Sequence, residues 1–237
     1  MNWSAEADRV IARADRVIAL ADRCLLGGAG RSLELAGLVR WVWCEPGGDE
    51  MRKRVGERIH EGVSMPSFYD TLPAELRNLT HREAVERYAA QGETPARAIA
   101  GMTREQLVAR PVAGTWSVQE IVVHMLDSDL TAAYRMKRTL AEERPVLDVY
   151  DETRFAQRLG YHEIDLGEVV ELFRLNRRMV AGILRRAGEA DFSRVAVHPE
   201  AGEVSLAGFV RLYVHHVNHH MKFVREKRAM VGAPLAE

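Results

Sequence analysis

The stretch His215-His216-Val217-Asn218-His219-His220 holds four of the nine histidines of the chain, within a helical pattern over residues 205–227. Residues four apart lie one above the other on the same face of a helix. Two pairs in the stretch have this spacing, His215 with His219 and His216 with His220. The stretch therefore predicts two imidazoles side by side on one helix face, and the neighbouring residues indicate which two.

The neighbours favour His216 and His220 as the pair that faces the protein interior. Alternating steps of three and four residues along this face meet large apolar side chains, which are Leu206, Phe209, Tyr213 and Phe223. The face of His215 and His219 instead carries residues typical of a solvated surface, which are Gly208, Lys222 and Glu226. We therefore expect His216 and His220 to point inward.

Two inward imidazoles one turn apart suit a divalent metal ion, because neutral imidazole is a common zinc ligand and a helix holds the pair rigidly. The alternative is a pair of core histidines with buried hydrogen-bond partners, and the spacing alone leaves it open. A third ligand would decide between them. His124 is the natural candidate, because it lies on the apolar face of a second helical pattern. Asp127, one turn further on, is a candidate acceptor for a ligand histidine, a candidate general base, or a surface charge.

Four helical segments of roughly 20 residues each and no convincing strand pattern predict an all-α, antiparallel four-helix bundle. The expected helices span residues 81–101, 118–143, 166–187 and 206–227. Thr80 and Ser117 are N-cap candidates, and each is followed three residues later by the glutamate of a capping box. Ser205 is the N-cap candidate of the last helix.

Residues 1–64 differ in pattern from the rest of the chain. An Ala-Asp-Arg motif recurs every seven residues, at Ala7, Ala14 and Ala21, and indicates a short amphipathic helix. We interpret 1–64 as a partly helical N-terminal extension, either a dimerising or regulatory arm or a segment dispensable for folding. The bundle and its metal site would then occupy residues 65–237, with Met65 at their start.

Composition excludes several classes of function. The formal net charge is −1, so there is no basic excess that would attract nucleic acid. Cys24 and Cys44 are far apart and form no CxxC motif. The sequence has no apolar run of about 18 residues and no signal-peptide pattern. We expect a cytoplasmic protein without nucleic-acid or membrane partners.

The sequence resembles a known family. The segment GTWSVQEIVVHMLDSD at residues 114–129, Tyr150-Asp151-Glu152, HPEAGE at 198–203 and the late histidine cluster occur in the order typical of DinB/YfiT-like proteins. This resemblance covers roughly residues 67–230. It implies a four-helix bundle, usually dimeric, with zinc or nickel on His124, His216 and His220. A further histidine that is common in the YfiT-like branch is replaced by Phe223.

The resemblance also implies an activity. Its characterised members include transferases that use a low-molecular-weight thiol, bacillithiol or mycothiol, and many others are assigned provisionally as metal-dependent hydrolases. Three protein ligands leave open positions on a metal, as in catalytic sites. We therefore expect a thiol S-transferase or hydrolase acting on a small molecule. The alternative is a non-catalytic, metal-binding stress-response bundle.

Overall fold

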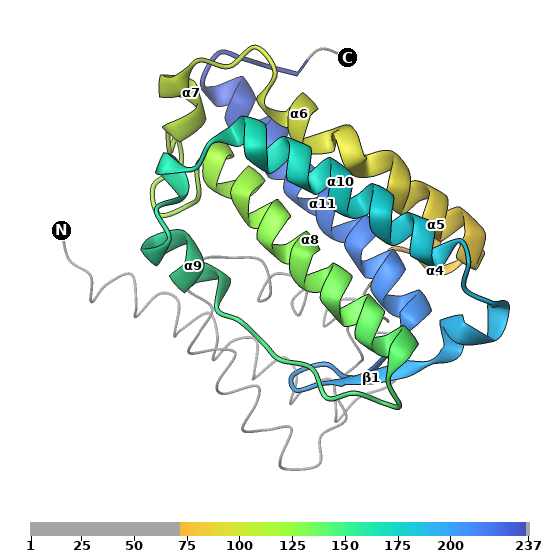
Figure 1. The fold of residues 1–237 in the computed structure, drawn as a ribbon. Helices are drawn as coiled ribbons and strands as arrows, with labels where there is room; N and C mark the ends of the chain where they lie inside the picture. The colour runs from red at the N-terminus through yellow and green to blue at the C-terminus, as the bar shows by residue number, and fades with distance from the viewer. Residues whose placement is uncertain (1–71, 236–237) are drawn as a thin grey trace, which may run out of the picture. The chain divides into compact units, whose positions relative to one another are not determined.

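Four long helices form the body of the protein in the computed structural model, which describes residues 72–235 (Figure 1). They are α5 (His81–Ala90), α8 (Val118–Ala141), α10 (Leu166–Leu184) and α11 (Leu206–Met230). Helices α5 and α8 each pack against both α10 and α11. The expected four-helix bundle is confirmed, and the interpretation of residues 1–64 lies outside the described residues.

The directions of the helices differ from those of a simple up-and-down bundle. The start of α5 and the end of α10 lie at the same end, where Arg185 pairs with Glu86 at 2.7 Å. At that end Arg194, whose backbone oxygen accepts from the N–H of Leu206 at the start of α11, donates to the backbone oxygen of Thr139 near the end of α8. The antiparallel order therefore holds for α8 with α11 and for α5 with α10. Helices α8 and α10 run parallel (Figure 1), because the long connection over residues 142–165 returns the chain to the end at which α8 began.

The expected caps begin the helices. Thr80 and Ser117 each accept a hydrogen bond from the backbone N–H of the glutamate three residues on, in a complete capping box. Ser205 accepts from the N–H of Gly208 at the start of α11. Asp165 caps α10 in the same way through the N–H of Glu168, a cap that the sequence pattern had not singled out.

The first expected helix, over residues 81–101, is interrupted. It consists of α5, a single 3₁₀ turn η2 (Gln91–Glu93) and α6 (Thr94–Ile99). Pro95 lacks the backbone N–H that a continuous helix needs, and it is tolerated here because it falls in the first turn of α6. The interruption places Gln91 between α10 and α11, where its side chain reaches the backbone oxygen of Val214.

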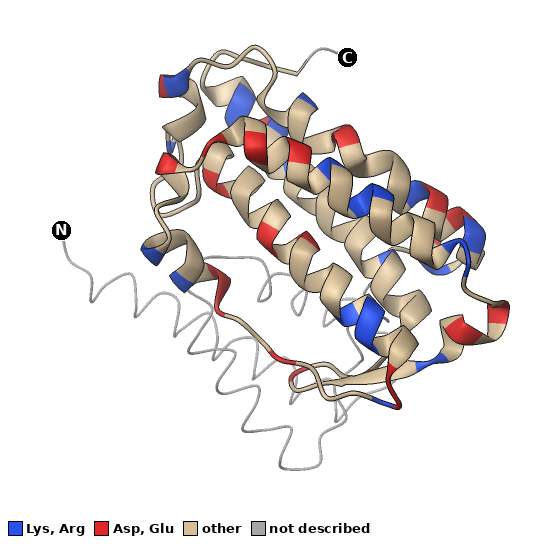
Figure 2. Ribbon diagram, in the orientation of Figure 1, with Lys and Arg blue, Asp and Glu red and all other residues tan. Residues whose placement is uncertain are grey.

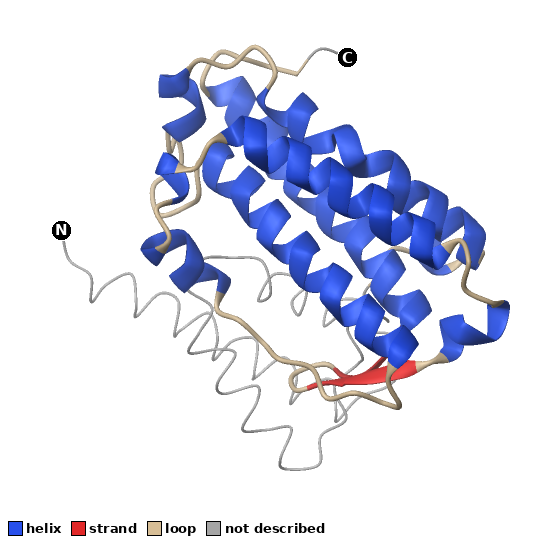
Figure 3. Ribbon diagram, in the orientation of Figure 1, coloured by secondary structure: helices blue, strands red, loops and turns tan. Residues whose placement is uncertain are grey.

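A small hairpin joins α10 to α11, although no strand was expected. Strands β1 (Val195–His198) and β2 (Gly202–Ser205) pair antiparallel, with His198 opposite Gly202 (Figure 3). Four-residue strands are too short for a clear alternating pattern, so their sequence carried little signal. The other described helices are short: α4 (Ala74–Arg77), α7 (Arg104–Val108), α9 (Glu152–Arg158), η3 (Tyr161–Glu163) and η4 (Glu189–Ser193).

Two apolar clusters form the core, with buried polar residues between them along the helices. Arg177 of α10 is fully buried and pairs with Asp129 of α8 at 2.8 Å. Its guanidinium also donates to the backbone oxygens of Tyr88 and Tyr213, so one side chain ties α10 to α5 and α11. All four long helices therefore share this network of buried polar contacts.

Candidate metal centre

His124 of α8 and His216 and His220 of α11 bring three imidazole rings together inside the bundle. One ring nitrogen from each lies within 4.8 Å of the other two. The ring centroids of His124 lie 5.2 Å from those of His216 and 4.8 Å from those of His220. The helical spacing aligns the α11 pair, and the antiparallel packing of α8 on α11 adds the third ring.

Hydrogen bonds between the rings cannot satisfy all of the close contacts among the three ring nitrogens. The Nε2 atom of His216 lies 3.3 Å from Nε2 of His124 and 3.0 Å from Nε2 of His220. A neutral imidazole nitrogen either donates one hydrogen bond or accepts one, so hydrogen bonding can satisfy only one of these contacts well. A divalent cation would accept all three lone pairs. The donor set therefore fits a metal ion that prefers nitrogen ligands.

Burial keeps the three imidazoles in the form that binds metals. It lowers the pKa of His124 to about 3. Burial also lowers the pKa of His216 and His220 well below the ordinary value, and repulsion from the neighbouring histidines adds to the effect. All three rings are neutral at pH 7 as a result, and each can offer a lone pair without first losing a proton.

The register of α11 agrees with the expectation from its apolar stripe. His220 is buried and His216 is half-buried, whereas Lys222 and Glu226 are exposed. Gly208, which was expected on the solvated face, is instead buried in the first turn of α11. His215 and His219 form a separate pair with ring centroids 6.0 Å apart, outside the three-histidine group.

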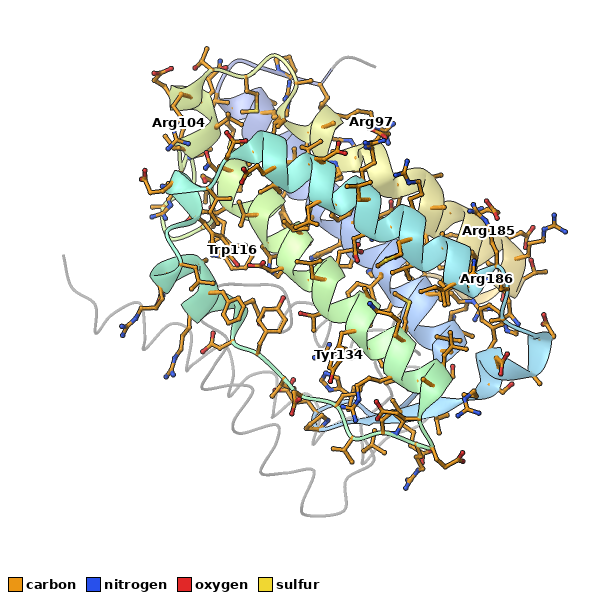
Figure 4. The ribbon with its side chains drawn as sticks, viewed as in Figure 1. Arg97, Arg104, Trp116, Tyr134, Arg185 and Arg186 are labelled. Atoms are coloured by element: carbon orange, nitrogen blue, oxygen red, sulfur yellow. The ribbon has the colours of Figure 1, made fainter. Side chains whose placement is uncertain are left out.

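Trp116, labelled in Figure 4, lies just before α8. Its ring packs against that of His124 with the centroids 4.8 Å apart. The second nitrogen of His124, Nδ1, is buried and has no hydrogen-bond partner among residues 72–235. Metal-binding histidines usually donate this N–H to a carboxylate or a backbone oxygen. His124 is thus held by packing against an aromatic ring in the described part of the chain.

Asp127 does not serve as the acceptor for His124. Its Oδ2 atom accepts a hydrogen bond of 2.5 Å from the hydroxyl of Tyr161 in η3. Burial raises the pKa of Asp127, and the hydrogen bond from Tyr161 opposes that rise. Burial and the Asp127 carboxylate together raise the pKa of the Tyr161 hydroxyl, which therefore stays protonated as the donor. A role for Asp127 as a general base stays a prediction.

Comparison with known proteins establishes the family. The model of the DinB superfamily matches residues 71–224, which include all three histidines. The chain belongs to the DinB superfamily. Within it, a Bacillus mycoides protein named "Putative metal-dependent hydrolase" is 31% identical over 180 residues, covering 76% of this chain and 96% of that protein.

YfiT of Bacillus subtilis, which carries the same kind of name, is 32% identical over 59% of this chain and 81% of its own length. Its solved structure is titled as that of a "probable metal-dependent hydrolase with an unusual four-helix bundle topology". It superimposes with a TM-score of 0.61 at 25% identity, covering 64% of this chain and 87% of that one. These relatives agree with the bundle described above.

The DinB-superfamily chain also carries polar residues near the histidines that the sequence patterns did not single out. Tyr161 lies outside the four helices expected from the sequence, and it is buried. Arg135 lies on the inward side of α8 and is also buried. Arg135 follows His124 by 11 residues, about three helical turns, so the two share a face of α8. An arginine on this apolar face was the feature of the sequence that could have indicated a functional residue.

Figure 2 shows acidic and basic residues on each of the four long helices. None of the described helices is long and apolar enough to cross a membrane.

Proposed function

We propose that His124, His216 and His220 bind one divalent metal ion, and that the chain is a metal-dependent enzyme acting on a small molecule. The convergence of three ring nitrogens within 4.8 Å carries this proposal. The names of the relatives, metal-dependent hydrolases by provisional assignment, support it. Zinc and nickel both suit an all-imidazole donor set.

Three neutral ligands suit a catalytic site better than a structural one. Structural zinc sites use four protein ligands, whereas catalytic sites leave a position open for water or substrate. When bound, the ion would supply a strong Lewis acid that makes a water or a thiol more acidic. Because the three histidines are neutral, they would not offset the charge of the ion, and its full positive charge would remain available at the open positions.

Asp127 is the candidate for moving the proton of the nucleophile. It lies one turn from His124 on α8, and burial raises the pKa of its carboxyl toward the range useful for a base. The hydrogen bond from Tyr161 fixes the carboxylate while leaving its second oxygen free to accept. In this role Asp127 would accept a proton from the water or thiol, and Tyr161 would position it.

The nucleophile distinguishes two activities that the same site supports. Activation of water gives a hydrolase, and activation of a low-molecular-weight thiol such as bacillithiol or mycothiol gives an S-transferase. Metal analysis of the purified protein should find one ion per chain. Turnover of an activated ester without thiol would support hydrolysis, and consumption of thiol with monochlorobimane would support transfer.

His216→Ala provides the control for both assays, because it removes a proposed ligand. Loss of metal and of turnover in this variant connects the activity to the site. A protein that binds one metal ion but turns over neither class of substrate would support the non-catalytic alternative. Absence of stoichiometric metal would refute the proposal.

A further inference from the structure

Arg135 of α8 is a buried cation without a carboxylate to balance it in the described part of the chain. Its side chain is 9% exposed. One terminal nitrogen donates to the backbone oxygen of Asp148 at 2.7 Å, and the other lies 3.4 Å from the hydroxyl of Tyr213. Its Nε has no hydrogen-bond partner among residues 72–235. Arg177, by contrast, is paired directly with Asp129.

The hydroxyl of Tyr213 lies beside this guanidinium. Burial raises the pKa of the Tyr150 and Tyr213 hydroxyls, and the nearby side chain of Ser128 opposes that rise in both. Ser128 follows His124 by one turn on α8, and the ring of Tyr213 meets that of His216 with centroids 5.9 Å apart. Tyr213 therefore links Arg135 to His216 of the three-histidine group.

The direction of side chains on a helix brings the guanidinium of Arg135 toward the histidines. Eleven residues separate it from His124, which is about 16 Å along a helix axis. A long side chain on a helix covers the turn N-terminal to its own Cα, so the guanidinium lies closer to the histidines than its backbone does. Its charge is also felt locally, since burial and Arg135 together lower the pKa of His198 to about 4.

We propose that Arg135, with the hydroxyl of Tyr213, binds the carboxylate of the small-molecule substrate. The reacting group of that substrate would lie at the three histidines, so the inference rests on the proposed function. An arginine fork matches the two oxygens of a carboxylate. A single unbalanced guanidinium neutralises one negative charge, whereas a phosphate monoester brings nearly two. A carboxylate is therefore the better match.

A pair of thiols tests this preference. The sulfur of each should bind a cobalt(II)-loaded protein and produce a thiolate-to-metal absorption band. 6-Mercaptohexanoate and 6-mercaptohexanol have the same sulfur and the same chain, and only the first carries a carboxylate. We expect the acid to bind the wild-type protein at least about tenfold more tightly, the effect of one charge-assisted hydrogen bond.

Substitutions on α8 separate a binding role from a structural one. Arg135→Gln should lower the affinity for the acid to that for the alcohol, and Arg135→Lys, which retains the charge without the fork, should give an intermediate affinity. Arg138→Gln is the matched control, because Arg138 lies one turn away and pairs with Glu142 at 2.6 Å. It removes the same charge and should leave the preference intact.

A second measurement needs no metal. Hexanoate, but not hexanol, should bind the metal-free protein in a calorimetric titration, and Arg135→Lys should weaken that binding. Equal affinity of the wild-type protein for both thiols, or loss of the preference in Arg138→Gln as well, would overturn the inference. If neither thiol produces a metal band, the S-transferase form of the proposed function fails, and the hexanoate titration still decides the role of Arg135.

Discussion

At the scale of single residues, burial decides which histidines can bind metal. His124 and His220 are buried among apolar side chains, and their low pKa values keep them neutral. His215 lies on the same helix only one residue before His216, yet it stands outside the three-histidine group. A rotation of about 100° between adjacent helical residues separates a ligand position from a marginal one.

This difference predicts unequal effects of two neighbouring substitutions. His216→Ala or His220→Ala should abolish stoichiometric zinc binding, because each removes one of three ligands. His215→Ala should leave it largely intact. Equilibrium dialysis followed by metal analysis measures both. Loss of the metal in His215→Ala with retention in His216→Ala would mean that the site is assigned to the wrong face of α11.

His198 should make the stability of the protein depend on pH. Its pKa is about 4 in the folded protein, mainly through burial, against about 6.5 when unfolded, so the unfolded chain takes up the proton first. Its contribution is complete above pH 6.5 and is lost as the pH falls toward 4. Neutral Nδ1 also faces the backbone N–H groups of Glu200 and Ala201 at 3.3 Å, which a protonated ring would repel.

Between pH 7 and pH 5 this single group should cost about 2 kcal/mol of unfolding free energy. Urea unfolding of the wild-type protein and of His198→Asn at both pH values checks it, since the difference between the two proteins removes the contribution of the other histidines. An identical pH dependence in the two proteins would rule out this role for His198.

At the scale of elements, the buried pair of Asp129 and Arg177 holds α8 against α10. Asn176 donates a further hydrogen bond to Asp129 at 2.8 Å, and Arg177 also reaches Gln91. Every polar atom of the pair faces another helix. Burial raises the pKa of Asp129, and the Arg177 guanidinium opposes that rise.

Removal of one partner should therefore be more damaging than replacement of both. Asp129→Ala leaves a buried guanidinium unbalanced and should cost about 3–5 kcal/mol of unfolding free energy. The double variant Asp129→Leu with Arg177→Met removes both charges and should recover much of that loss. Chemical denaturation of the wild-type protein, of the single variants Asp129→Leu and Arg177→Met, and of the double variant forms a complete cycle. Additive losses would show that the charges do not interact.

At the scale of the whole molecule, the DinB-superfamily model and the described bundle cover nearly the same residues. The predicted boundary at residue 65 stays a prediction. A chain that begins at Met65 should fold, give the helical circular dichroism signal of a bundle and bind one metal ion with unchanged affinity. Loss of solubility or of metal in this shortened chain would show that residues 1–64 contribute to the folded core.

Local patterns in the sequence were enough to predict the helices and the inward face of α11. The capping boxes at Thr80 and Ser117 and the apolar stripe around His216 depend on residues within a turn or two, where short-range sterics and hydrogen bonds dominate. The hairpin was missed because four-residue strands are specified by pairing with each other. Leu172 belongs to the apolar periodic pattern of α10 but is 45% exposed, since a periodic pattern does not show how wide the buried stripe is.

The sequence by itself determined which residues could be ligands, through helical spacing and the family resemblance, and which helix faces are apolar. Only the tertiary structure decided that His124 meets His216 across 92 residues of chain, that α8 and α10 run parallel, and that Arg135 lies beside Tyr213. The physical reason is range. Periodicity and caps act between neighbours along the chain, whereas contacts between helices depend on how every apolar face is buried at once.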